Sequence, residues 1–300
     1  MSDSVGKKLP SNLSHLERLI DTWAKSDPER GVQLAPGRMT THRRLRRLIG
    51  VTAIAGALDG LRDNNGTPRF GIKGGSAMEL RFGFAARTSK DLDAAFRGEL
   101  DEALNLIASA LDGGWNNFTG VLGDVQGITR VNVEPKPIRV PIKVRYKNQP
   151  FVTIPLELAA AEGKSMDEPE FLTTVFVLQA VQLVEPGPIA LLPTRYQIAQ
   201  KLHACTEDVG EPPNDRVRDL ADLMMLRALA VQPEDLPDIR IACHEIFAGR
   251  LQHPWPPEVT NWPGWDLIWN GLCEQEGIDI DLEDAVEAVR LLVSEIDESR

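Results

Sequence analysis

The change in hydrophobic period along the chain is the feature that most constrains its fold. Apolar residues recur near helical spacing over residues 12–25 and 40–62. Between residues 128 and 185 the pattern changes to runs rich in Val and Ile, which is typical of antiparallel strands: ITRVNVE, IRVPIKVRY, FVTIPLELA and TVFVLQAVQLV. After Pro193 the helical period returns nearly to the end. The sequence therefore predicts an α/β (α+β) fold with a mixed sheet, followed by a helical domain.

These changes of pattern also suggest the domain boundaries. Residues 1–39 are predicted to form an N-terminal helix and a linker, because the stretch 28–37 contains two prolines and two glycines. Residues 40–190 are predicted to form the α/β domain and residues 191–300 the helical domain. The segment EPGPIALLP, residues 185–193, is the expected link between them.

Composition excludes several classes of protein. The chain has 300 residues, of which 42% are hydrophobic and 26% charged, as in soluble globular proteins. It contains no apolar run of roughly 18 residues and no signal-peptide core, so we expect a cytoplasmic protein without a membrane partner. Cys205, Cys243 and Cys273 are far apart and form no CxxC pair. Neither a zinc site nor a disulfide framework is indicated, and any metal should have oxygen ligands.

The charge distribution is uneven. A net charge of −11 argues against nucleic acid as a partner, because phosphate contacts dominate such binding. Two stretches are nevertheless basic: Arg38, Arg43, Arg44, Arg46 and Arg47 in the first, and Arg130, Lys136, Arg139, Lys143, Arg145 and Lys147 in the second. Both are candidate nucleic-acid surfaces, and the alternative for each is an ordinary solvated face.

The most informative segment is KGGSAMELRFGFAARTSKDLDAAF. Alternate side chains of a strand share a face, so Asp91 and Asp93 should point the same way. Two adjacent carboxylates repel each other unless a cation joins them, and Mg²⁺ prefers such oxygen ligands. Gly74 and Gly75 would let the backbone approach a phosphate at the start of a helix, where free N–H groups attract anions.

Simpler structural roles are open for the same residues. A D-x-D triplet can be an exposed strand end. Ser76, a candidate donor to phosphate, also fits an S-x-x-E capping box with Glu79. Glu157 lies in an apolar strand and is a candidate third carboxylate, because a charge there needs a partner or a metal. Its alternative is an exposed position on a half-solvated strand.

Two blocks together resemble a known family. The first is GGS followed by Arg87-Thr88-Ser89-Lys90-Asp91-Leu92-Asp93. The second is Lys201-Leu202-His203, a loop, and then Arg216-Val217-Arg218-Asp219-Leu220-Ala221-Asp222-Leu223. In this order they resemble the nucleotidyltransferase toxins of the AbiEii/AbiGii type, including the MenT toxins of mycobacteria, which belong to type IV and type VII toxin–antitoxin systems. The resemblance covers about residues 70–230.

The resemblance implies a fold like that of DNA polymerase β, with a helical domain that completes the active site. It implies Mg²⁺, with Mn²⁺ as an alternative, bound by Asp91 and Asp93, with Glu157 as the third carboxylate. Lys201 would neutralise the triphosphate, and Asp219 would be the essential carboxylate of the second motif. The implied nucleotide-binding residues are Lys73, Gly74, Gly75, Ser76, Arg87 and Lys201.

The function implied by the resemblance is transfer of nucleotides from a nucleoside triphosphate to the 3′ end of tRNA. Such transfer would block aminoacylation and translation until a cognate antitoxin neutralises the toxin, which is expected to be monomeric when active. Two alternatives are nucleotidylation of a protein hydroxyl and a catalytically silent binding module. The intact D-x-D pair, Lys201 and Asp219 argue against the silent module.

The second block also permits structural roles. Lys201 lies beside an apolar helical stripe and is either a cleft residue or a surface lysine. Asp219 and Asp222 are helical neighbours, and are either functional, exposed, or partners of Arg216 and Arg218. His203 is predicted to be a packed residue. In the first block, a phosphate or nucleotidyl group on Ser89 would disfavour triphosphate binding, whereas a small strand-edge role is the alternative.

Overall fold

The chain divides near Leu191 into a sheet-containing unit and a helical unit. The computed structural model describes residues 9–26, 41–127, 136–173, 178 and 181–299. Unit 1 extends to Ala161 and includes Pro169–Leu191, whereas unit 2 combines Glu162–Glu168 with the chain from Leu192 onwards. Among the described helices, none is long and apolar enough to span a membrane.

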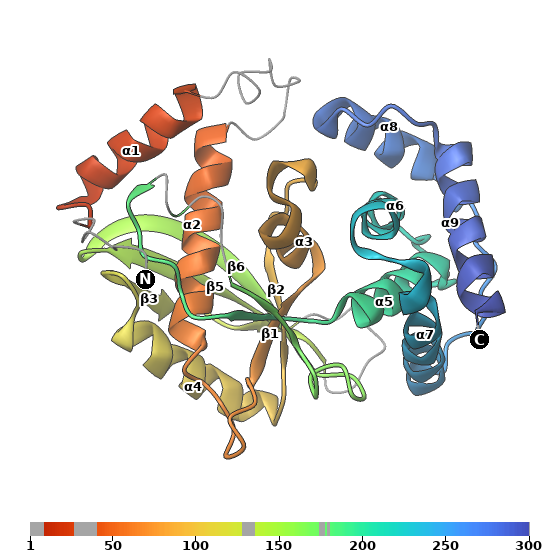
Figure 1. The fold of residues 1–300 in the computed structure, drawn as a ribbon, viewed down its shortest axis with the longest axis horizontal. Coiled ribbons are helices and arrows are strands. Elements are labelled where there is room, and N and C mark those ends of the chain that lie inside the picture. Colours follow the sequence, from red (N-terminus) through yellow and green to blue (C-terminus); the bar gives the residue numbers. More distant parts are fainter. Residues whose placement is uncertain (1–8, 27–40, 128–135, 174–177, 179–180, 300) are drawn as a thin grey trace. The chain divides into compact units, whose positions relative to one another are not determined.

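A mixed sheet forms the centre of unit 1 (Figure 1). Its strand order is β3-β5-β6-β2-β1-β8-β7, and β4 pairs with β5. The pairs β2–β6 and β1–β8 are parallel, and the other pairs are antiparallel. The mixed α/β prediction is therefore confirmed. The strands are β1 (Phe70–Lys73), β2 (Leu92–Phe96), β3 (Phe118–Leu122), β4 (Gln126–Gly127), β5 (Ile138–Tyr146), β6 (Gln149–Ala160), β7 (Glu170–Leu172) and β8 (Ile189–Leu191).

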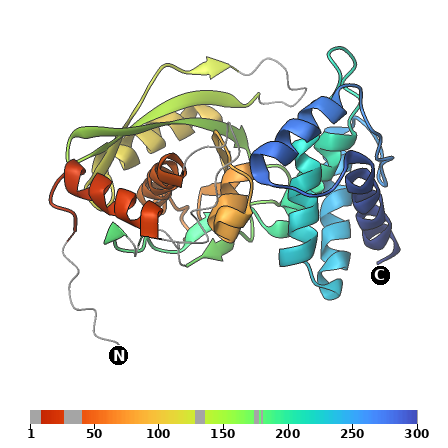
Figure 2. The ribbon, with the colours of Figure 1, turned by 90° about the horizontal axis from the view of Figure 1, so that it is seen from above.

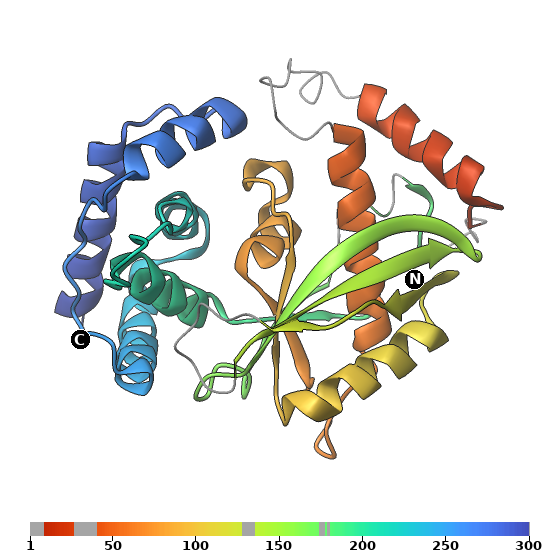
Figure 3. The same cartoon turned by 180° about the vertical axis from the view of Figure 1, so that it is seen from behind.

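The strands β5 and β6 form a long antiparallel hairpin, visible from behind in Figure 3. Its turn is Lys147-Asn148, and both residues have positive φ, at 46° and 64°. This is the two-residue geometry that matches the right-handed twist of paired strands, and Asn tolerates it well. The predicted strands IRVPIKVRY and FVTIPLELA are thus confirmed as one hairpin.

In the described part of unit 1 there are four α-helices and the short 3₁₀ helix η1 (Gly83–Ala85). Helices α2 and α4 pack on the sheet, and α1 packs on α2 (Figures 1 and 2). The shared core includes Leu16 and Ile20 of α1, so this helix is part of the same hydrophobic cluster as the sheet. The helices are α1 (Leu13–Ser26), α2 (Thr41–Leu58), α3 (Gly74–Phe82) and α4 (Leu100–Gly113).

Two local predictions are wrong. The described residues of the expected strand 174–184, Leu178 and 181–184, form turns and loop, because Gln182 has a φ of 59° that a strand does not accommodate. The expected link 185–193 contains the buried strand β8. The predicted strand ITRVNVE and the predicted linker 28–37 lie outside the described residues.

Unit 2 is helical, as expected for the chain after Pro193. Its helix α5 packs against α6 and α7, and α9 packs against α6 and α7. The segment Glu162–Glu168 joins this unit through Glu162, which accepts hydrogen bonds from Arg250 and Gln200. The elements are α5 (Thr194–Thr206), α6 (Arg218–Ala230), η3 (Pro233–Asp235), α7 (Leu236–Arg250), α8 (Trp265–Glu276) and α9 (Leu282–Glu298).

The packing of α1 gives a testable prediction. Leu16 is fully buried in the core of unit 1. Leu16→Ala should lower the free energy of unfolding by about 2–5 kcal/mol, because it removes buried methyl groups and leaves a cavity. Urea unfolding followed by circular dichroism measures the change. Ser14→Ala, at an exposed position on the same helix, is the control. A Leu16→Ala protein as stable as the control would show that α1 contributes little to unit 1.

Candidate functional site

Four charged residues align across one face of the sheet in unit 1. Asp93 on β2 pairs in register with Glu157 on β6 and with Lys73 on β1. Glu157 in turn pairs with Arg139 on β5. Directly paired residues of neighbouring strands point to the same side, so Arg139, Glu157, Asp93 and Lys73 form a charged row with the two carboxylates in the middle. The flanking Leu92 and Leu156 are buried on the opposite face.

Asp91 lies just before β2, at the entrance to the row. Its Oδ1 accepts a hydrogen bond of 2.5 Å from Nη2 of Arg139. That hydrogen bond, followed by the negative charges of Asp91, Glu157 and Asp93, raises the pKa of Arg139. Asp91 and Asp93 therefore lie together with Glu157 around one guanidinium.

The backbone at Gly74 fits closely against Asp93. Gly74 begins α3 and has a φ of 59°, a conformation that favours glycine. A Cβ atom at this position would lie 2.2 Å from Oδ2 of Asp93, so no larger residue fits without displacing the carboxylate. At Gly75, a Cβ atom would approach Oγ of Ser89 to 2.9 Å and Nη1 of Arg87 to 3.7 Å. The predicted Gly-Gly turn thus brings a helix start to the carboxylates and to Arg87.

Ser76 lies in the interior of unit 1, near the start of α3. Helix α3 begins at Gly74 with Lys73 as its N-cap, and no side chain caps it, so the capping box of Ser76 and Glu79, which was the alternative to a phosphate contact, does not form. Ser76 is fully buried. Its hydroxyl donates to the backbone carbonyl of Asp91 at 2.8 Å and accepts from Arg47 at 2.8 Å. Because the side chain is enclosed, we assign any phosphate contact here to the backbone.

The backbone carbonyl of Asp91 is held by three donors. Besides Ser76, Nη2 of Arg47 donates to it at 2.8 Å and the hydroxyl of Ser89 at 2.9 Å. Ser89 is only 5% exposed, which disfavours the modification considered for it. These contacts fix the backbone from which the Asp91 carboxylate projects.

Glu79 anchors this network from the interior. The side chain is 0% exposed and accepts from Nε of Arg44 at 2.8 Å and from Nη1 of Arg47 at 2.5 Å. The backbone N–H of Ser89 also donates to it, at 3.1 Å. Arg44 additionally donates to the backbone carbonyls of Gly83, Phe84 and Ala86. Burial lowers the pKa of Arg47 while Glu79 opposes the shift. The two arginines therefore tie α2 to α3 and to the segment that leads into Asp91.

These contacts correct the interpretation of the N-terminal basic stretch. Arg44 and Arg47 are 3% and 6% exposed, and both donate to buried Glu79. Arg46 donates to the carbonyl of Phe151, lies over its ring, and pairs with Glu17. Arg38 and, in the second stretch, Arg130 lie outside the described residues. Arg44, Arg46 and Arg47 are consequently structural residues of α2, whereas Arg43 is exposed.

Unit 2 holds the second motif in one buried cluster. Nζ of Lys201 on α5 donates to Asp219 at 2.7 Å and to Asp222 at 2.6 Å, both on α6. Lys201 is 7% exposed and Asp222 is 2% exposed. The predicted neighbours Asp219 and Asp222 are thus brought together with Lys201, and neither aspartate is a surface acid. Two carboxylates compensate the ammonium, and its expected role towards a triphosphate stays a prediction.

His203 is a packed residue, as predicted. It is fully buried, and its ring contacts those of Phe247 and His253. Burial, followed by the positive charge of Arg250, lowers its pKa from 6.5 to about 3. The imidazole is therefore neutral at physiological pH.

The carboxylates of unit 1 have the chemistry of a hard-cation site. Asp91, Asp93 and Glu157 offer oxygen donors of the type that Mg²⁺ prefers, and a guanidinium already occupies a cationic position beside them. Over the described part of the chain, however, no three His, Cys, Asp or Glu side chains are gathered closely enough to hold a metal ion. The metal-binding roles of these residues stay predictions.

Sequence comparison identifies the family. A model of the AbiEii nucleotidyl transferase toxins of type IV toxin–antitoxin systems matches residues 56–289. The chain belongs to this family. The match extends beyond the resemblance recognised over residues 70–230 and includes both the charged row and the cluster at Lys201. No match was found among curated proteins.

Two solved structures are similar to this AbiEii-family chain. The MenT4 nucleotidyltransferase toxin of Mycobacterium tuberculosis H37Rv shares 15% identity at a TM-score of 0.47, over 95% of this chain and 99% of that one. An antigenic nucleotidyltransferase-like protein of Paracoccidioides brasiliensis shares 15% identity at a TM-score of 0.41, over 74% of this chain and 95% of that one.

The interior ion pairs give a stability prediction. Glu79→Ala should lower the free energy of unfolding by about 3–5 kcal/mol, because it leaves two buried guanidinium groups without their carboxylate. Urea unfolding measures the loss. Asp124→Ala, which removes an exposed carboxylate of the same unit, is the control and should change stability little. Equal midpoints for the two variants would contradict the anchoring role of Glu79.

The low pKa of His203 predicts a pH dependence of unit 2. Its folded value of about 3 lies below the ordinary 6.5, so the unfolded chain binds a proton that the folded one does not. Stability should therefore fall as the pH falls from about 6.5 towards 3, by up to about 2 kcal/mol between pH 6.5 and 5. Urea unfolding at both pH values tests this. His203→Gln should flatten the dependence, and an equally steep fall in that variant would contradict the assignment.

Proposed function

We propose that this chain is a metal-dependent nucleotidyltransferase that adds nucleotides from a nucleoside triphosphate to the 3′ end of tRNA. The added nucleotides block aminoacylation and thereby translation, and a cognate antitoxin neutralises the activity. The active form is a cytoplasmic monomer. Membership of the AbiEii toxin family supports the class of reaction, and the resemblance of the two motifs supports the tRNA acceptor.

The observation that carries the proposal is the position of Asp93. It lies in register beside Glu157, close to Asp91 around Arg139, and directly against the backbone of Gly74 at the start of α3. Carboxylates that can bind a cation therefore lie next to the N-terminus of α3. The free N–H groups and the partial positive charge of this helix end favour phosphate. A metal-bound triphosphate needs both groups side by side.

We assign the residues of unit 1 as follows. Asp91 and Asp93 would hold the Mg²⁺ or Mn²⁺ ion, with Glu157 beside Asp93 as a third oxygen donor. When bound, the metal supplies charge stabilisation to the reacting phosphates. The backbone of Gly74, Gly75 and Ser76 receives the terminal phosphates. Lys73 and Arg87 contribute positive charge to them.

The contacts of Asp91 determine its orientation. Its backbone carbonyl is fixed by Arg47, Ser76 and Ser89, and its carboxylate is bound by Arg139. Phosphoryl transfer depends mainly on positioning and on charge stabilisation. A carboxylate held in this way requires little rearrangement when it meets a cation, which is the condition for efficient electrostatic catalysis.

The cluster of unit 2 is assigned to the same reaction because its residues match the second motif of the family. Lys201 would counter charge on the triphosphate, and Asp219 holds its ammonium at 2.7 Å. Asp222 holds the same ammonium at 2.6 Å. Lys201→Met should therefore reduce transfer without affecting the fold of unit 1.

Transfer itself is tested with labelled nucleotides. The protein is incubated with total tRNA, Mg²⁺ and each α-labelled nucleoside triphosphate in turn, and the label in RNA and in protein is separated on gels. The wild type should label tRNA. Asp91→Asn should reduce the rate at least ~100-fold, because the charge that gathers the metal is lost while the size of the side chain is kept.

Asp124→Asn is the matched control, since it neutralises an exposed aspartate of the same unit. If Asp91→Asn still labels tRNA at the wild-type rate, Asp91 does not belong to the active site. Label in protein instead of tRNA would replace the proposed acceptor with a protein hydroxyl. A wild type that labels neither would favour a silent binding module.

A further inference from the structure

Three basic residues of β5 share one face of the hairpin. Arg139, Lys143 and Arg145 alternate with Val140, Ile142 and Val144, which are buried in the core of unit 1. Lys143 and Arg145 are exposed, and the side chain of Arg139 is 42% exposed. Because alternate residues of a strand point the same way, these three side chains form one surface, which we call the basic face of β5.

The basic face begins at the charged row. Arg139 belongs to both, since it pairs in register with Glu157 and donates to Asp91. From Arg139 to Arg145 the strand rises about 20 Å at ~3.3 Å per residue. Stacked nucleotides of one strand rise about 3.4 Å each, so this length spans roughly six of them.

Arg139 is paired with Asp91, whereas the neighbours of Lys143 and Arg145 leave the charge of these two residues uncompensated. Thr153 on β6 and Val121 on β3 are the register partners of Lys143, and Thr119 on β3 is the partner of Arg145. None of these is acidic. Within the described ranges, no carboxylate forms an ion pair with Lys143 or Arg145.

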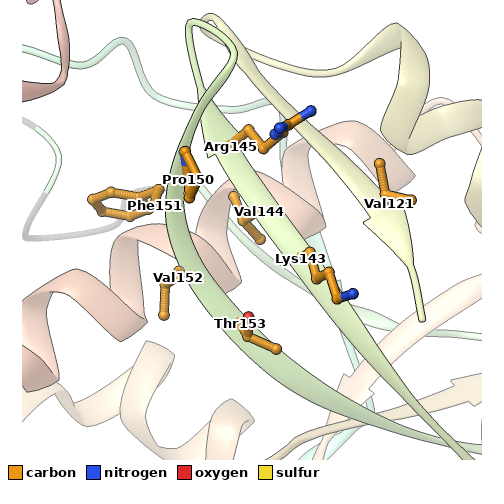
Figure 4. Close-up of a pocket in the computed structure, with 8 residues that line it drawn as sticks. All are labelled: Val121, Lys143, Val144, Arg145, Pro150, Phe151, Val152 and Thr153. Carbon is orange, nitrogen blue, oxygen red and sulfur yellow. The ribbon is translucent and has the colours of Figure 1, made fainter. Parts of the chain in front are cut away.

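An open depression lies over the same strands. It measures ≈ 420 Å³ and is lined by Lys143, Arg145 and residues of β3 and β6. Figure 4 shows Lys143 and Arg145 extending from β5 towards the side of Val121, whereas Phe151 extends the opposite way. The volume is in the range that accepts a nucleotide-sized group.

We propose that the basic face of β5 binds the phosphate backbone of the nucleic-acid acceptor and leads its end to Asp91 and Asp93. This inference rests on the proposed function, and it identifies which of the two basic stretches contacts the acceptor. The face is positive and exposed, and it is continuous with the carboxylates. A surface that guides a polyanion to Asp91 and Asp93 needs these properties.

Charge favours a nucleic acid over an acidic protein as the occupant. The chain as a whole carries −11, so a polyanion needs a local basic surface in order to bind. The acceptor hydroxyl must reach the carboxylates, and the phosphates behind it then need cations along the approach. An acidic protein partner could bind the basic face without any of its groups reaching the charged row.

The test compares two double charge reversals in the full-length protein. Lys143→Glu with Arg145→Glu changes the basic face, and Arg18→Glu with Lys25→Glu makes the same change at exposed positions of α1 in the same unit. Binding of total tRNA is measured by filter binding between 50 and 200 mM salt. The KM and kcat for tRNA are measured in the labelling assay.

The basic-face variant should bind tRNA at least ~10-fold more weakly than wild type, and its log–log salt dependence should be shallower by about 2. Its KM for tRNA should rise while kcat at saturating tRNA stays unchanged, as for a loss of uniform binding. The α1 variant should behave like wild type.

Three results overturn the inference. If wild type labels tRNA and the basic-face variant has the same KM and affinity, the face does not bind the acceptor. If that variant keeps tRNA binding but loses a copurifying protein partner, the face is a protein interface. If wild type labels no tRNA at all, the proposed function fails and this inference fails with it.

Discussion

The ion pairs of Glu79 with Arg44 and Arg47 are the interaction on which the candidate site depends. They join α2, α3 and the segment before β2, and Arg47 extends from Glu79 to the backbone carbonyl of Asp91. Buried ion pairs contribute less to stability than their number suggests, because desolvation opposes their attraction. Their effect here is positional. They hold the Asp91 backbone at a defined place beside the sheet, and the register of β2 and β6 then places Asp93 beside Glu157.

Sequence patterns predicted the elements that carry the site. The strand at Asp93, the helix after Gly74 and the strands β5 and β6 are confirmed; the Gly-Gly-Ser turn indicated the start of the helix, and the runs rich in Val and Ile indicated β5 and β6. Helical spacing predicted that Asp219 and Asp222 are neighbours, but it did not predict that both pair with Lys201. Strand β8 was missed because its three residues lie among prolines in a stretch that resembles a linker.

The buried role of Arg44 and Arg47 could not be predicted in the same way. A run of arginines suggests a solvated or nucleic-acid-binding surface, and only tertiary structure reveals Glu79, more than thirty residues away, as their partner. The one available signal was Glu79 itself, the only acid of the short helix α3. The charged row could not be predicted from the sequence either. It depends on the register between four strands, and not on the spacing of residues within one segment.

The parallel pairing of β2 with β6 has a consequence for synthesis of the protein. Asp93 and Glu157 are neighbours only after α4, β3, β4 and β5 have been made and β6 has returned beside β2. Closing a loop of this length is entropically unfavourable until the pairing forms. An unfinished chain on the ribosome therefore contains the D-x-D pair but not the row, so a member of a toxin family remains without its assembled site until most of unit 1 has been translated.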